Sequence, residues 1–186
     1  MGANGPASRH STRRDPAFGR VRVDPGNTAF WEGREYRISY EYSVGGTPLV
    51  IRFESPIDFI LQTQDLSIDE GNIRFRAYRS TQGSEGGTFD ESIPIYGANI
   101  MNETPSVPTQ ISITTGGSFT PDAGQSATET IRVRTANATS QRTTVTGSLG
   151  DERGLSPGTY YLEFARIDGT NTATGVFTLE WEERAP

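Results

Sequence analysis

A long alternation of apolar and polar side chains in residues 34–44 constrains the fold more than any other sequence feature. Apolar side chains fall on one side of an extended backbone and polar side chains on the other. The apolar positions are Tyr36, Ile38, Tyr40, Tyr42 and Val44, and the polar positions are Arg37, Ser39, Glu41 and Ser43. A helix would scatter the same apolar residues around its circumference, and the aromatic content also favours a strand. Because one apolar face needs a covering layer, the sequence predicts a sandwich or barrel with this strand near its middle.

Similar alternation predicts further strands along the chain. They are expected at residues 49–55, 58–63, 67–68, 73–79, 93–96, 110–115, 130–135, 159–167 and 175–182. Turn-forming residues at 45–48, 69–72 and 168–171 predict that the strands flanking each turn pair as hairpins. The Gly-rich segment between Ser80 and Phe89 is expected to be a mobile loop at an edge of the sandwich. No segment has a helical period, so the predicted fold class is all-β: an antiparallel β-sandwich, jelly-roll-like, with an extended N-terminal arm.

Charge is divided unevenly between the beginning of the chain and the rest. Residues 1–20 hold four arginines against one acid, whereas the remainder holds thirteen arginines against twenty-two acids. Residues 1–27 lack sustained periodicity and are predicted to be an extended basic arm, with residues 28–186 forming the sandwich domain. The arm is either a tether for a partner surface or a solvated tail. All 17 basic residues are arginine, which suits ordered contacts with carboxylates, although an arginine-favouring genome gives the same composition.

The residues that usually carry chemistry are scarce. Cysteine is absent, which excludes disulfides and thiolate sites, and the one histidine is His10 in the arm. Oxygen ligands for calcium occur at Asp65, Asp69, Glu70 and Asn72, but their spacing is unlike an EF-hand loop and favours an ordinary solvated turn. A carboxylate pair for glycoside hydrolysis depends on spatial proximity and stays open. We therefore predict a non-enzymatic protein without catalytic, cofactor or metal residues.

The partners suggested by composition are proteins or sugars. Tyr78, Tyr96 and Tyr161 are expected to face outward, where they would form a sugar-stacking platform or fill an interface. The acidic body repels phosphates, so nucleic-acid binding is not expected. No apolar run is long enough to predict a membrane span, and no secretory signal is seen.

Three passages resemble small β-sandwich virion proteins of tailed bacteriophages. They are AFWEGREYRISYEYSV at residues 29–44, IRVRTANAT at 131–139 and DERGLSPGTYYLEFARIDGTNTATGVFTLEWEER at 151–184. Within the last passage, LSPGTYYLEF also resembles jelly-roll modules of secreted proteases. The phage resemblance spans roughly residues 28–184 and is carried by strand and turn patterns without catalytic content.

The phage resemblance implies a capsid decoration or cement protein that binds the major capsid protein shell and stabilises it. Such a protein assembles in the host cytoplasm, is found on the capsid exterior and is expected to be a homo-oligomer, for example a trimer. The implied partner-binding residues lie in the arm. Its arginines would pair with acidic rims of the partner surface, and Phe18 would serve as an apolar anchor. They are Arg9, Arg13, Arg14, Phe18 and Arg20. The alternative is a carbohydrate- or receptor-binding β-sandwich module, for example of a head fibre or tail.

Overall fold

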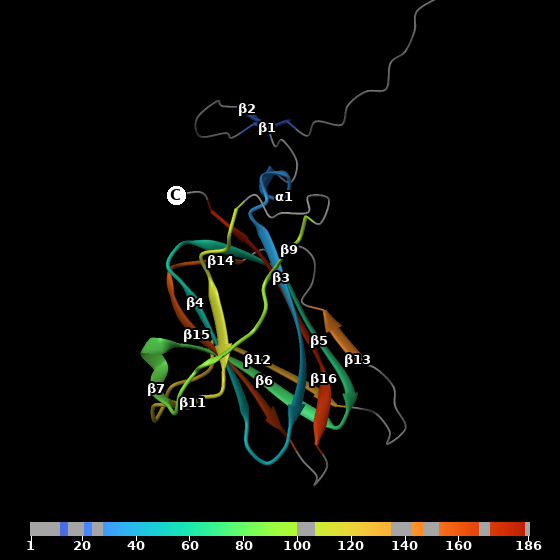
Figure 1. Cartoon of the computed structure of the whole chain (residues 1–186), viewed down its shortest axis with the longest axis vertical. Helices are drawn as coiled ribbons and strands as arrows, with labels where there is room; N and C mark the ends of the chain where they lie inside the picture. The colour runs from blue at the N-terminus through green and yellow to red at the C-terminus, as the bar shows by residue number, and fades with distance from the viewer. Residues whose placement is uncertain are drawn as a thin grey trace, which may run out of the picture.

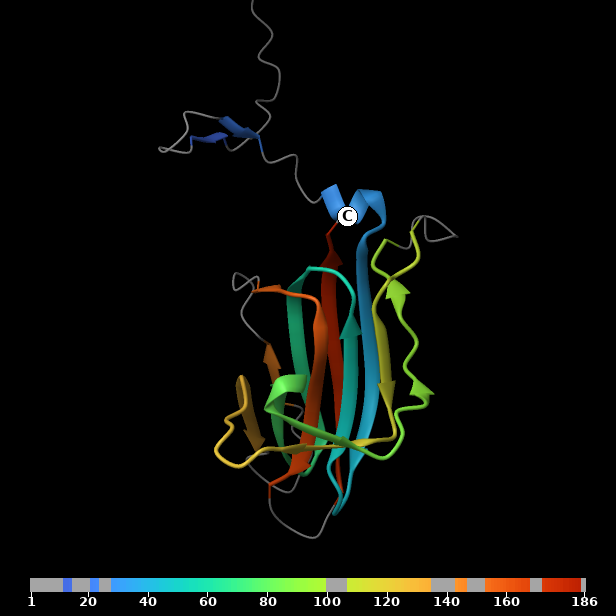
Figure 2. The ribbon, with the colours of Figure 1, turned by 90° about the vertical axis from the view of Figure 1, so that its left-hand side faces the viewer.

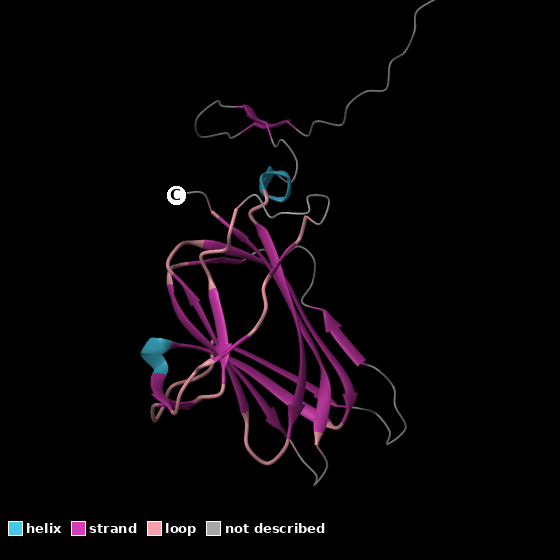
Figure 3. Cartoon of the chain, in the orientation of Figure 1, coloured by secondary structure: helices cyan, strands magenta, loops and turns pink. Residues whose placement is uncertain are grey.

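A computed structural model describes residues 12–14, 21–23, 28–99, 107–134, 143–146, 153–167 and 172–184. Strands make up most of the regular structure (Figures 1 and 3). The strands are β1 (Thr12–Arg14), β2 (Val21–Val23), β3 (Glu35–Val44), β4 (Leu49–Ser55), β5 (Phe59–Glu70), β6 (Asn72–Arg79), β7 (Gly83–Gly86), β8 (Glu91–Ser92), β9 (Tyr96–Gly97), β10 (Ser112–Thr115), β11 (Ser118–Pro121), β12 (Glu129–Arg134), β13 (Thr143–Thr146), β14 (Arg153–Leu155), β15 (Gly158–Arg166) and β16 (Ala173–Glu183). The helices are α1 (Thr28–Glu32) and a single 3-10 turn, η1 (Ser80–Gln82).

Two antiparallel sheets pack face to face, which confirms the predicted all-β sandwich. The first sheet has the order β13-β5-β16-β3-β9, with β14 also paired to β5. The second sheet has the order β12-β6-β15-β4-β10-β8. In Figure 1 strands β4 and β15 of the second sheet lie toward the left, and β3, β5, β16 and β13 of the first sheet lie toward the right. Strand β3 matches the predicted strand but lies toward one edge of its sheet, and β16 occupies the middle instead.

Consecutive long strands cross between the sheets instead of pairing with each other. β3 lies in the first sheet and β4 in the second, and the same division separates β5 from β6 and β16 from β15. The three predicted hairpins are therefore wrong, although the strands themselves are found. Turn residues determine where the chain reverses, whereas here each strand faces its sequence neighbour across the core. The resulting orders, β3-β16-β5-β13 and β4-β15-β6-β12, are typical of jelly-roll connectivity.

Aromatic side chains from both sheets fill the core. The ring of Phe164 in the second sheet lies 5.1 Å from Phe177 and 5.5 Å from Tyr42, both in the first sheet. The Tyr42 hydroxyl donates a hydrogen bond to the Ser67 carbonyl, 2.8 Å away. Gly175 makes this arrangement possible, because a Cβ atom there would lie 2.0 Å from the Ser67 oxygen and 2.5 Å from the Tyr42 hydroxyl.

Strands β7 and β11 pair to form a ribbon over the outer face of the second sheet, which we call the cover ribbon. In Figure 2 this ribbon lies in front of that sheet. The Phe119 ring stacks on Tyr161 at 4.2 Å and lies 5.5 Å from Tyr78. The prediction of a loop at an edge of the sandwich is therefore wrong, because residues 83–86 form β7 over a sheet face, whereas the expected mobility stays a prediction. The apolar contribution comes from Phe119 in the partner strand and from Phe89, whose ring lies 6.0 Å from Tyr161.

The chain before residue 28 is described only at β1 and β2, which pair antiparallel with each other. The division into a 1–27 arm and a 28–186 sandwich stays a prediction. Directly after it, α1 is a helix that the sequence analysis did not identify, because five residues are too few to establish a period.

Candidate functional site

Two large apolar side chains are strongly exposed in the described part of the protein: Trp31 at 68% and Tyr96 at 59%. Trp31 belongs to α1, which precedes β3, and Tyr96 in β9 lies opposite Arg37 near the beginning of β3. The Asn99 amide donates a hydrogen bond to the Phe30 carbonyl (3.2 Å) and so ties the segment after β9 to α1. Both aromatic residues therefore lie at the end of the sandwich next to α1 (Figure 1), which we call the arm end.

The other two tyrosines predicted to be exposed are buried. Tyr78 and Tyr161 do point to the outer side of the second sheet, but the cover ribbon leaves them only 2% and 3% exposed. Of the three tyrosines predicted to form a sugar-stacking platform, Tyr96 is thus the one that is exposed. The sequence analysis did not select Trp31 as a binding residue, and its position just outside the alternating segment was the available signal.

Buried tyrosine hydroxyls serve the fold as hydrogen-bond donors. The Tyr36 hydroxyl donates to the Val107 carbonyl at 3.0 Å, and that of Tyr161 donates to the Glu85 carboxylate. Burial, together with the nearby Glu183 carboxylate, raises the pKa of Tyr36 to about 12. Burial, then the hydrogen bond to Glu85, raises the pKa of Tyr161 above its ordinary value. Both phenols keep their protons at neutral pH.

Buried carboxylates likewise have partners within the protein. Glu183, only 3% exposed, accepts hydrogen bonds from the Thr109 hydroxyl and from the backbone N–H of Gln110 (3.1 Å). Glu35 accepts a hydrogen bond from the Gln62 amide at 2.8 Å. These bonds join β16 to the segment before β10 and β3 to β5, so both carboxylates hold strands in position.

A third buried carboxylate lies within a basic corner on the outer face of the second sheet, formed by Arg74, Arg76 and Arg132 around Glu163. Glu163 accepts from Arg76 Nη2 at 2.5 Å, and Arg74 lies 3.8 Å away. Arg132 is exposed and lies directly opposite Arg74 across the β6–β12 pair. The corner therefore carries three guanidinium groups and one carboxylate in a protein whose net charge is −6.

The outer face of the first sheet has the opposite charge, and we call it the acidic face. Its carboxylates include Glu41 in β3, Asp65 in β5 and Glu180 in β16, and Arg37 is a cation on the same face. Glu180 lies opposite Arg37, and Asp65 lies opposite Thr178 in the same sheet. The basic corner on one outer face and the acidic face on the other are thus complementary in charge.

The predicted partner-binding residues of the arm are not brought together with any described surface. Arg9, Phe18 and Arg20 lie outside the described residues. Arg13 and Arg14 belong to β1, where they lie opposite residues of β2, and only their backbone is described. The arm residues therefore stay a prediction.

The oxygen-rich turn after β5 does not form a cluster. Strand β5 continues through Asp69 and Glu70, and β6 begins at Asn72 after Gly71 in a left-handed conformation (φ 81°). Across the described residues, no three His, Cys, Asp or Glu side chains are grouped as metal ligands. The same residues include no helix with the length and apolar character needed to cross a bilayer.

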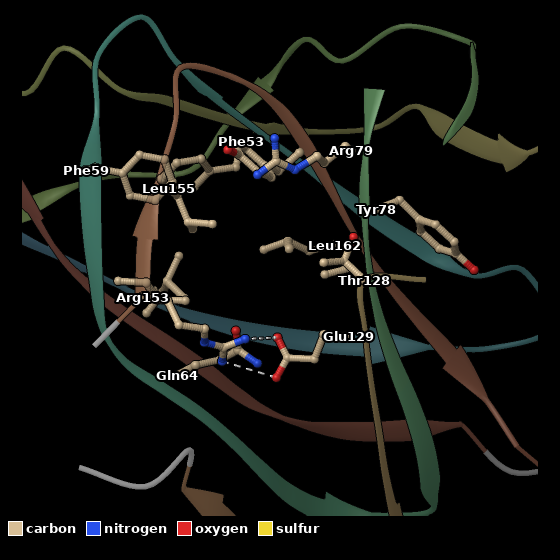
Figure 4. Close-up of a pocket in the computed structure, with 14 residues that line it drawn as sticks. Phe53, Phe59, Gln64, Tyr78, Arg79, Thr128, Glu129, Arg153, Leu155 and Leu162 are labelled. Carbon is tan, nitrogen blue, oxygen red and sulfur yellow. Dashed lines mark hydrogen bonds and ion pairs between the residues drawn. The ribbon is translucent and has the colours of Figure 1, made fainter. Parts of the chain in front are cut away.

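A pocket of about 90 Å³ opens between the two sheets where β12 faces β14 (Figure 4). Most of its wall is apolar, and its polar part gathers at one side. The apolar wall includes Phe53, Phe59, Leu61, Ala77, Leu155, Leu162 and Leu179, and the polar side includes Gln64, Thr128, Glu129 and Arg153. Natural cores contain few such spaces, so this pocket is a candidate binding site.

An ion pair closes the polar side of the pocket. Arg153 of β14 donates to both carboxylate oxygens of Glu129 in β12, at 3.1 and 3.3 Å, and so joins the first sheet to the second. Because the Arg153 side chain is 45% exposed, the pair contributes at most about 1 kcal/mol. A ligand can therefore open this side of the pocket at small cost.

Comparisons with protein-family models, curated proteins and solved structures found no match.

Proposed function

We propose that this chain is a non-enzymatic structural protein of a phage virion, a capsid decoration or cement protein that binds the major capsid protein shell and stabilises it. The observation that carries the proposal is the exposure of Trp31 and Tyr96 together at the arm end. Aromatic side chains are enriched at the centres of protein interfaces, where they supply much of the binding energy. The end from which residues 1–27 extend is therefore the proposed docking end.

The arm adds to this contact in the proposed arrangement. Its basic residues pair with acidic rims of the shell, and Phe18 inserts as an apolar anchor beside the surface formed by Trp31 and Tyr96. The partner is a protein surface, and neither nucleic acid nor membrane is part of the proposal. The proposed location is the exterior of the capsid, after assembly in the host cytoplasm.

Contacts between neighbouring copies are the second part of the proposal. The basic corner of one copy faces the acidic face of the next, which gives a head-to-tail contact between different surfaces. Such contacts close into rings, for example trimers, when the rotation between copies permits. Charge complementarity between these faces is the support for a homo-oligomer.

The decisive experiment is cosedimentation of the purified full-length protein with phage heads that lack it, followed by a heat or low-salt challenge. We expect saturable binding that raises the resistance of the heads. Trp31→Ala should weaken binding at least tenfold, because interface tryptophans often contribute 2 kcal/mol or more, about thirtyfold. Thr47→Ala, at an exposed turn at the opposite end of β3, is the matched control and should bind normally. Absence of binding, or equal binding by both variants, would contradict the proposal.

Deletion of residues 2–20 separates the contribution of the arm from that of the sandwich. We expect the truncated protein to fold, with an unchanged thermal midpoint, and to lose shell binding. Full binding after the deletion would restrict the docking surface to the sandwich itself.

A carbohydrate- or receptor-binding module is the second candidate, favoured by the same exposed aromatic rings, since jelly rolls also occur in lectins. It predicts glycan binding in the absence of any shell and a loss of that binding in Tyr96→Ala. A glycan array with the wild-type protein and this variant distinguishes the two functions.

A further inference from the structure

Gln64 is the most informative residue in the pocket between the sheets. It is only 6% exposed, and it contributes to the wall of the pocket. Figure 4 shows it beside the Arg153–Glu129 ion pair, on the polar side of the pocket. A side-chain amide on a pocket wall offers a donor group and an acceptor group, so it favours a hydrogen-bonding partner bound in the pocket.

The ion pair determines the charge of that partner. Glu129 and Arg153 neutralise each other across the pocket opening, so an anionic group would meet the carboxylate and a cationic group would meet the guanidinium. The Gln64 amide offers both a donor and an acceptor, and a second amide complements both. A neutral amide is therefore the group that best fits the polar side.

The remaining wall determines the apolar part of the ligand. Phe53, Phe59, Leu155, Leu162 and Leu179 surround the volume of about 90 Å³. A cavity of about 150 Å³ holds benzene, so a smaller, branched aliphatic group of about three or four carbons fits here.

We propose that this pocket binds a short branched aliphatic group attached to a neutral amide. The same chemistry occurs in a free small amide and in an aliphatic side chain followed by its peptide group. The inference does not depend on the proposed virion function.

The test is a titration of the full-length, isotope-labelled protein in which backbone amide chemical shifts are measured by NMR at each ligand concentration. The probes are isobutyramide for a free amide, N-acetyl-leucine N-methylamide for a peptide source, and isobutyrate as the anionic isostere. We expect saturable shifts at Gln64, Ala77 and Leu162, with a Kd on the order of 1–10 mM for so small a ligand. Isobutyrate should bind at least fivefold more weakly. Binding by the peptide probe alone would identify a polypeptide as the source.

Two variants keep the proposal falsifiable. Gln64→Leu should remove the preference for isobutyramide over isobutyrate, whereas Gln125→Leu, on an exposed loop that does not line the pocket, should keep it. Leu162→Phe should fill the pocket and abolish binding; if it does not fold, the comparison at Gln64 still decides. No saturable shift with either amide, meaning that the pocket holds water only, overturns the proposal. An unchanged preference in Gln64→Leu overturns it equally.

Discussion

Replacing Glu163 by Gln should destabilise the sandwich through charge alone. The side chain keeps its shape and one oxygen acceptor, so both Arg76 hydrogen bonds, at 2.5 and 3.0 Å, can be retained in neutral form. Loss of the charge weakens those bonds by about 1 kcal/mol in total and leaves Arg74 and Arg76 without their shared counter-ion. Removing one partner of a fully buried pair costs about 3–5 kcal/mol. Because the Arg76 and Arg74 side chains are 28% and 32% exposed, we expect a smaller loss of about 2 kcal/mol.

Urea denaturation measures this loss and a matched control isolates its cause. With an m-value of about 2–3 kcal/mol/M, the midpoint should fall by roughly 0.8 M while m stays constant. Glu54→Gln removes a charge from the exposed pair with Arg52 on the same outer face, and it should cost less than about 0.5 kcal/mol. Salt at about 1 M should reduce the deficit of Glu163→Gln, because it screens the repulsion between the arginines. Equal stability of the two variants, or a deficit that salt does not change, would refute the reasoning.

Three further predictions test other parts of the fold. The pKa of Tyr36 is about 12 in the folded state and 10.0 in the unfolded state, so the phenol ionises first in the unfolded protein. The free energy of unfolding should therefore fall as pH rises from about 10 toward 12. Tyr36→Phe should reduce this alkaline loss in pH-dependent thermal melts. Gly175→Ala should destabilise the protein by about 2–3 kcal/mol in urea melts, since the new Cβ would overlap the Ser67 carbonyl, whereas Gly46→Ala, with no atom within 4 Å of its Cβ position, should change little. Phe119→Ala should accelerate hydrogen exchange in β7 while β16 stays protected; equal acceleration in both strands would mean that the cover ribbon is not a separate unit.

The positions of strands were predictable and their partners were not. Alternation identified β3, β15 and β16 almost to the residue, because each places every second side chain in one core. The same alternation arises whether a strand pairs with its neighbour in sequence or faces it from the opposite sheet. Short turns then made hairpins the simplest interpretation, and the crossing between sheets is visible only when all partners are known together.

For the surface residues, too, the direction of a side chain was predictable from the sequence and its environment was not. The outward direction of Tyr78 and Tyr161 followed from the strand period, but their burial depends on the cover ribbon, contributed by distant residues around Phe119. The pocket also has no signature in the sequence, because Gln64, Glu129 and Arg153 come from three strands that meet only in the folded sandwich. Long-range proximity, and not local propensity, determines each of these sites.

The placement of the charged faces has a consequence for assembly under the proposed function. The basic corner and the acidic face lie on opposite outer sides of one sandwich, so a contact between them cannot be a two-fold contact of identical surfaces. Every copy in a growing row keeps one face without its counterpart until the row closes. Exposed charge pairs contribute little individually, so such rows are weak in dilute solution. A shell that holds the arm ends at fixed spacing raises the effective concentration of neighbouring faces, and the symmetry of the shell, not that of the sandwich, then determines where the row closes.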